Sequence, residues 1–155
     1  MFTSVDGLPL HPLVVHAVVV LLPLATLGGL AVAARPRWGR TYGPLVAGVS
    51  VLAAVAAVVA VEAGQALQVV MSNDGDLLEG IARHSAYGLT VRTLALAFAA
   101  VAVASTVAAF RTRPGSTVHR ASAWLAVAVG AAATWYAYLA GDSGARSVWG
   151  YLFES

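Results

Sequence analysis

Four long apolar stretches limit what this chain can fold into. They cover roughly residues 12–34, 43–70, 85–110 and 118–140. A helix needs about 20 apolar residues to cross the hydrocarbon core of a bilayer, and each stretch is long enough. The stretches are apolar on nearly every side, which is typical of helices that face lipid. Only 10% of the residues are charged, whereas about a quarter are charged in an average soluble domain. The sequence therefore predicts an all-α integral membrane protein with four transmembrane helices.

The two short connections, at 35–42 and 111–117, favour antiparallel neighbours, and so a single domain with an up-down-up-down bundle. Six arginines lie in or beside these connections: Arg35, Arg37, Arg40, Arg111, Arg113 and Arg120. The opposite side carries only Arg83 and Arg146, together with most of the acidic residues. Because arginine-rich short loops stay in the cytoplasm, we expect both termini to be extracytoplasmic. Residues 141–155 then form a short tail that is apolar enough to lie at the interface.

Composition and motifs argue against several functions. The arginines form no single basic patch, so we do not expect nucleic acid as a partner. The chain has no cysteine, which excludes thiolate metal ligands and cysteine nucleophiles within it. No phosphate-binding loop, His-Glu-x-x-His motif or nucleophile elbow occurs. We therefore assign no catalytic residue and expect a protein that is not an enzyme.

Ionisable residues inside the apolar stretches gather in the half predicted to be extracytoplasmic. Charges at membrane depth usually pair and face the bundle interior. We therefore expect Glu62 and Arg92 to face inward and to pair, directly or through Gln65. Asp142 closes the fourth stretch on the same side. The predicted structural polar cluster is Glu62, Gln65, Arg92 and Asp142.

The histidines are the other candidates. His16 and His84 open the first and third stretches, which are diagonal in such a bundle, so both rings could enter one cavity. His11 lies five residues before His16 and on another face; we expect it to precede the helix, nearer the water. His119 is expected to be an interfacial residue. The chain also has two hairpins of similar layout, although the residues of the two halves match poorly.

Three functions remain open from these residues. In the first, the protein binds haem b as an electron carrier, with His16 and His84 as axial ligands and Arg92 near a propionate. In the second, zinc or copper is bound without haem; the ligands would be His11, His16, Glu62 and His84. In the third, the cluster only fixes helix packing. The protein is then an accessory subunit of a larger membrane complex, or a homo-oligomer in the bilayer.

Four segments carry a family resemblance: "LHPLVVHAVVVLLPLA", "EAGQAL", "ARHSAYG" and "AGDSGARSVWG". In this order they resemble the bacterial membrane family catalogued as domain of unknown function 2231, over nearly the whole chain. The resemblance implies a four-span protein of the bacterial cytoplasmic membrane. The positions of the family's motifs correspond in this chain to His11, Pro12, His16, His84, Gly141 and Gly144. The chain departs from the family pattern at Ala17 and Val18, where an aromatic-proline pair is common, and at Trp149, where tyrosine is commoner. Some members resemble fusions to Rieske-type iron–sulfur domains, which implies a neighbourhood of electron transfer; a membrane redox complex is a candidate partner.

Overall fold

The computed structural model describes residues 4–5, 8–71 and 78–149. Four helices form nearly all of this part, and each is long and apolar enough to cross a membrane. The prediction of four membrane-spanning helices is therefore confirmed. The helices are α1 (Leu10–Ala34), α2 (Gly39–Met71), α3 (Leu78–Arg111) and α4 (Thr117–Trp149). A 3-10 turn, η1 (Pro36–Trp38), precedes α2, and the strands β1 (Ser4–Val5) and β2 (Leu8–Pro9) form a short antiparallel pair before α1.

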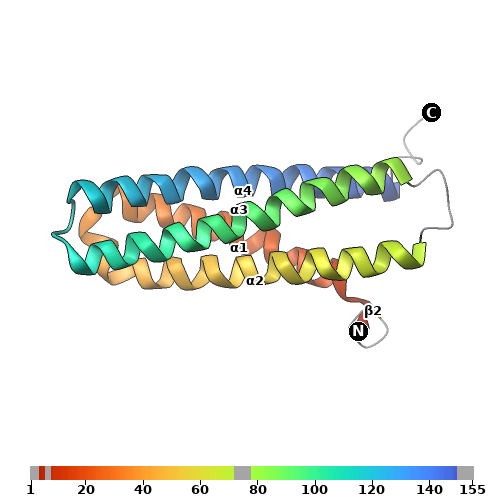
Figure 1. The fold of residues 1–155 in the computed structure, drawn as a ribbon, viewed down its shortest axis with the longest axis horizontal. Coiled ribbons are helices and arrows are strands. Elements are labelled where there is room, and N and C mark those ends of the chain that lie inside the picture. The colour runs from red at the N-terminus through yellow and green to blue at the C-terminus, as the bar shows by residue number, and fades with distance from the viewer. Residues whose placement is uncertain (1–3, 6–7, 72–77, 150–155) are drawn as a thin grey trace.

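The helices form the predicted up-down-up-down bundle (Figure 1). Helices α1 and α3 each pack on α2 and α4, so α1 and α3 lie on one diagonal. The α1–α2 and α3–α4 connections share one end of the bundle. We call this the arginine end, because the six arginines of the two connections lie there. The opposite end, where α1 and α3 begin, is called the histidine end after His11 and His84.

The helices at the histidine end are longer than the apolar stretches. Helix α3 begins at Leu78 rather than near residue 85, and α4 continues to Trp149 rather than ending near residue 140. Hydropathy falls where a helix leaves lipid, whereas its backbone hydrogen bonds continue into the interface. Residues 141–149 of the expected tail therefore belong to α4, and 150–155 lie outside the described residues. Helix α1 begins at Leu10, so His11 lies in its first turn and not ahead of it.

The bundle has small residues inside and large apolar residues outside. Alanines such as Ala53, Ala95 and Ala133 are fully buried around Phe98 and Leu22. Large aliphatic side chains are exposed instead: Val20, Leu24, Leu27, Leu45 and Leu52. Small side chains let membrane helices approach closely, because lipid is as apolar as leucine and gives no reason to bury the larger side chains. This distribution agrees with a bundle surrounded by lipid.

Side chains tie the helices together at the arginine end. The Arg40 guanidinium of α2 donates to the carbonyl oxygens of Ala109, at 2.8 Å, and Thr112, at 3.0 Å, and so caps the end of α3. His119, which we expected at the interface, is buried, with 1% of its surface exposed. Gly39 makes this burial possible, because a Cβ atom built on Gly39 would lie 2.6 Å from both Cε1 and Nε2 of His119. The His119 side chain therefore packs inside the bundle at the arginine end and does not face outward; its interfacial depth stays a prediction.

Candidate functional site: a histidine pair at one end of the bundle

His11 of α1 and His84 of α3 meet at the histidine end. Their ring centroids are 5.7 Å apart, and the ring planes make an angle of 84°, an edge-to-face contact. The two helices lie on a diagonal and have few contacts with each other, so the rings meet across the interior of the bundle. The histidine that the structure brings to His84 is therefore His11, and not His16.

A backbone carbonyl on the neighbouring helix orients each ring. Nδ1 of His11 lies 2.8 Å from the carbonyl oxygen of Ala60 on α2, and Nδ1 of His84 lies 2.8 Å from the carbonyl oxygen of Ala140 on α4. A carbonyl only accepts hydrogen bonds, so both Nδ1 atoms carry the proton and donate it. In the neutral ring, the Nε2 atom of each histidine then keeps a free lone pair.

A glycine one turn further along makes room for each ring. A Cβ atom on Gly64 would lie 2.9 Å from Nδ1 of His11, and a Cβ atom on Gly144 would lie 2.9 Å from Nδ1 of His84. Real Cβ atoms do not approach other atoms this closely without a shift of the neighbour. Each histidine therefore needs a carbonyl and a glycine, four residues apart on the neighbouring helix.

This arrangement occurs once in each hairpin. The segments "AVEAG" at 60–64 and "AGDSG" at 140–144 share an alanine, an acidic residue, a small residue and a glycine at the same spacing. The similarity of the two hairpins, weak over the whole chain, is thus concentrated where the histidines are held. Sequence reasoning missed the roles of Ala60 and Ala140, since a main-chain acceptor leaves no mark in residue type. The acidic-small-glycine pattern, which occurs at 62–64 and again at 142–144, was the sequence feature that could have indicated these two positions.

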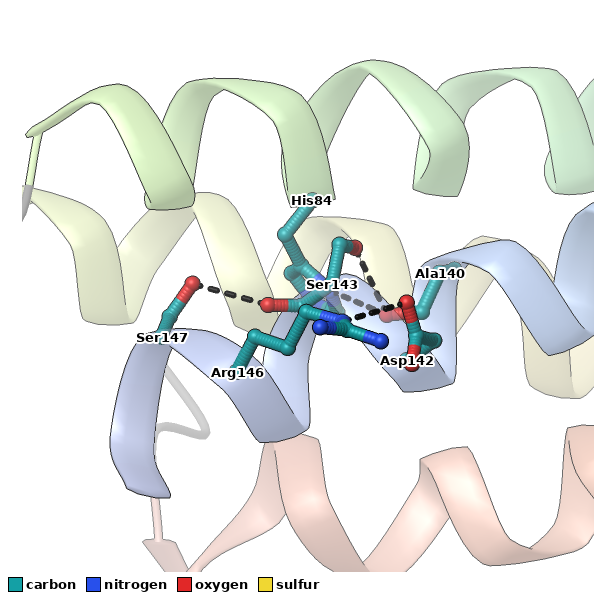
Figure 2. Close-up of polar contacts among 6 residues, drawn as sticks. All are labelled: His84, Ala140, Asp142, Ser143, Arg146 and Ser147. Carbon is teal, nitrogen blue, oxygen red and sulfur yellow. Dashed lines mark hydrogen bonds and ion pairs between the residues drawn. The ribbon is translucent and has the colours of Figure 1, made fainter. Parts of the chain in front are cut away.

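Figure 2 shows the α4 side of the site. The Ala140 carbonyl oxygen accepts from Nδ1 of His84 and also from the hydroxyl of Ser143, at 2.9 Å. Asp142 accepts from Arg146, one turn along α4, at 2.9 Å. Both of these charged side chains are substantially exposed. Asp142 therefore pairs within its own helix and not with the other members of the predicted polar cluster.

His16 lies outside the pair. Its side chain is exposed. Its Nδ1–H donates a hydrogen bond to the carbonyl oxygen of Pro12 in the same helix, at 2.6 Å. Among the described residues, no three histidine, aspartate or glutamate side chains are grouped closely enough to hold one metal ion. The predicted ligand set of His11, His16, Glu62 and His84 is therefore not a single cluster.

Glu62 and Arg92 pair as expected, but they do not face inward. Nη1 of Arg92 lies 3.5 Å from Oε1 of Glu62, and the two side chains are 33% and 64% exposed, respectively. The contact is direct, and the Gln65 side chain is exposed nearby on α2. The pair thus lies on the outer α2–α3 face of the bundle.

Helix length allows the exposed charges of Glu62 and Arg92 to lie outside the hydrocarbon core of a bilayer. Helices α2, α3 and α4 have 33, 34 and 33 residues, whereas the hydrocarbon core spans about 20 residues of a helix. Counting about 20 residues from Arg40, Arg111 and Arg120 reaches Ala60, Arg92 and Ala140. On this count, a hydrocarbon core that begins at these arginines would end at the level of the histidine pair and the ion pair. The expectation that Glu62 and Arg92 face the bundle interior was therefore wrong, and the depth of the pair in a bilayer stays a prediction.

The fold and the site together define a four-helix membrane protein with a pair of carbonyl-oriented histidines at one end. The chain belongs to the family described as Predicted membrane protein (DUF2231), whose model matches residues 7–154. This match confirms the family resemblance that the four sequence segments carry. No curated protein and no solved structure matches the chain.

Proposed function

We propose that this protein binds copper through Nε2 of His11 and Nε2 of His84. The observation that carries the proposal is the contact between two rings whose Nδ1–H groups both donate to backbone carbonyls. Metal-binding histidines nearly always donate their other ring N–H to a carbonyl or carboxylate, which fixes the ring and its tautomer. Both histidines have this partner.

The ring separation suits one ion between two imidazoles. With a metal–nitrogen distance of about 2.0–2.1 Å, two ring centroids lie about 5.2 Å apart at a tetrahedral angle and about 6.4 Å apart when opposite. The observed 5.7 Å falls between these values. A haem would need opposite ligands, with the ring centroids about 6.4 Å apart, and the observed 5.7 Å is shorter. Arg92, the residue considered for a propionate, is bound to Glu62 on the outer face.

The number of ligands favours copper over zinc. Structural zinc sites have four protein ligands and catalytic zinc sites have three. Within the described residues, only two ligand side chains meet here. Copper binds imidazole most tightly among the common divalent metals, and Cu(I) accepts low coordination numbers.

Copper binding by histidine variants tests this proposal. We expect His11→Ala and His84→Ala each to lower the copper content of the purified protein from one equivalent to near zero, because one imidazole alone holds the ion weakly. His16→Ala is the matched control and should bind copper as the wild type does, since its ring is exposed and bonded to its own helix. Elemental analysis and X-ray absorption at the copper edge measure stoichiometry and ligand number.

Two results would contradict the proposal. If the wild-type protein takes up no copper, the two histidines only stabilise helix packing. That result would favour the alternative of an accessory subunit of a membrane complex. A Soret band after haem-supplemented expression, lost in His84→Ala, would instead assign the pair to haem and electron transfer.

We also propose that the histidine end is extracytoplasmic and the arginine end is cytoplasmic in a bacterial inner membrane. Support comes from the six arginines at one end, against Arg83 and Arg146 at the other. The chain has no cysteine, so single cysteines can report sidedness. In whole cells, a membrane-impermeant maleimide should label Ala145→Cys and should label Thr117→Cys only after permeabilisation; both positions are exposed. The reverse pattern would invert this topology.

A further inference from the structure

An apolar groove runs along the outer α2–α3 face. It has a volume of about 340 Å³ and opens to the surroundings. Two buried alanines, Ala54 and Ala99, form its floor. Its walls are valines of α2 and Leu96 of α3, which are largely exposed. Aliphatic walls around a small-residue floor leave a channel into which an extended hydrocarbon chain fits.

The Glu62–Arg92 ion pair lies at one end of this groove. Glu62 is one helical turn beyond Val58 of the α2 wall, and Arg92 is one turn before Leu96 of α3. Residues three and four apart share a helix face. The ion pair therefore continues the same two rows of side chains that form the groove walls, towards the histidine end.

The ion pair has hydrogen-bonding capacity to spare. Its closest contact is 3.5 Å, longer than the roughly 2.7–2.9 Å of a strong charge-assisted bond. A guanidinium has five N–H donors, and a carboxylate has about four acceptor sites. Because both side chains are partly exposed, an approaching group can bind the acid and the base together.

We propose that this face is a binding site for a zwitterionic phospholipid with a primary ammonium headgroup, of the phosphatidylethanolamine class. One acyl chain lies in the groove, the phosphate accepts hydrogen bonds from Arg92, and the ammonium donates to Glu62. An anionic headgroup would satisfy Arg92 but be repelled by Glu62. A choline headgroup carries the positive charge but has no N–H to donate.

The length of the groove supports a lipid of a single leaflet. From Glu62 to Val51, at the far end of the wall, is 11 residues, or about 16 Å of helix. Half of the hydrocarbon core is about 15 Å thick. The groove thus reaches from the membrane boundary to the middle of the bilayer, which is the depth that one acyl chain occupies below its headgroup.

Native mass spectrometry with defined lipids tests the site. The purified wild-type protein, incubated with equal amounts of phosphatidylethanolamine, phosphatidylcholine and phosphatidylglycerol, should retain one ethanolamine lipid at several-fold higher occupancy than the other two. Arg92→Gln should weaken retention of all three by about tenfold, the scale of one lost charge-assisted bond. Glu62→Gln should abolish the preference for ethanolamine over choline, because the amide no longer attracts the ammonium.

Two further variants separate the groove from the charges. Val55→Phe adds bulk at an exposed wall position (55% exposed), where folding should be unaffected, and should displace the acyl chain. Asp142→Asn removes an exposed ion pair on α4 and should leave retention unchanged. Equal wild-type retention of the three lipids, or full retention in Val55→Phe, overturns the proposal. A lipid-free dimer that Val55→Phe dissociates also overturns it and assigns the face to a second copy of the chain.

Discussion

Replacing Gly64 or Gly144 with alanine is expected to lower copper affinity by about 10–100-fold, the usual cost of disturbing the groups that orient a metal ligand. The new Cβ atom would lie 2.9 Å from Nδ1 of the facing histidine and 3.0 Å from its Cε1 atom. The ring must move, and the hydrogen bond to the Ala60 or Ala140 carbonyl is lost with it. Each hairpin orients its histidine with the same hydrogen bond and the same glycine contact. We therefore expect the two substitutions to lower copper affinity by similar factors.

Gly141→Ala is the matched control for this prediction. Gly141 lies in α4 beside Gly144, and a Cβ atom there meets nothing within 4 Å. Copper affinity should be unchanged, and the helix gains the higher helical propensity of alanine. Nitrogen chemical shifts of labelled histidine follow the ring tautomers without metal. They should change in Gly64→Ala and Gly144→Ala but not in Gly141→Ala; unchanged shifts in the first two would show that the rings do not depend on the glycines.

Hydropathy predicted the four helices because a lipid-facing helix needs a minimum length of apolar residues, whatever its packing. It did not predict where the helices end in the interface, since hydrogen-bonded turns continue there in polar sequence. The extra turns of α3 and α4 lie at the histidine end. The helical residues of α3 before residue 85 and of α4 after residue 140 were missed for this reason.

The histidine pair could be predicted only in part. The sequence predicts that His84 faces α1 across the diagonal; the haem hypothesis pairs it with His16, and only the metal hypothesis includes His11. The choice depended on where α1 begins. With Leu10 as the first helical residue, His11 falls in the first turn and faces the bundle, and His16, about 140° away on an ideal helix, faces outward. A helix start that moves by two residues thus changes which side chain enters the site.

Gly39→Ala is expected to destabilise the bundle by about 1–3 kcal/mol, the usual cost of overpacking a core. The backbone at Gly39 is ordinary right-handed helix, with φ −55° and ψ −39°, so an alanine meets no conformational strain. The cost comes from space: the Cβ atom would lie 2.6 Å from two ring atoms of His119 and 3.1 Å from Cβ of Ala109. The His119 ring is enclosed, and Nδ1 accepts from the Gly115 N–H.

A double-mutant cycle distinguishes this steric cost from a general effect on α2. His119→Ala removes the ring that the new methyl group meets, so Gly39→Ala should cost much less in the His119→Ala background than in the wild type. Gly48→Ala, elsewhere in α2 with nothing within 4 Å of its Cβ position, should leave the melting temperature in detergent unchanged or raise it. If the stability losses of Gly39→Ala and His119→Ala add, the absence of a side chain at Gly39 is not what makes room for the His119 ring. Other contacts would then stabilise the packing at the arginine end, such as the hydrogen bonds from Arg40 to the carbonyl oxygens at the end of α3.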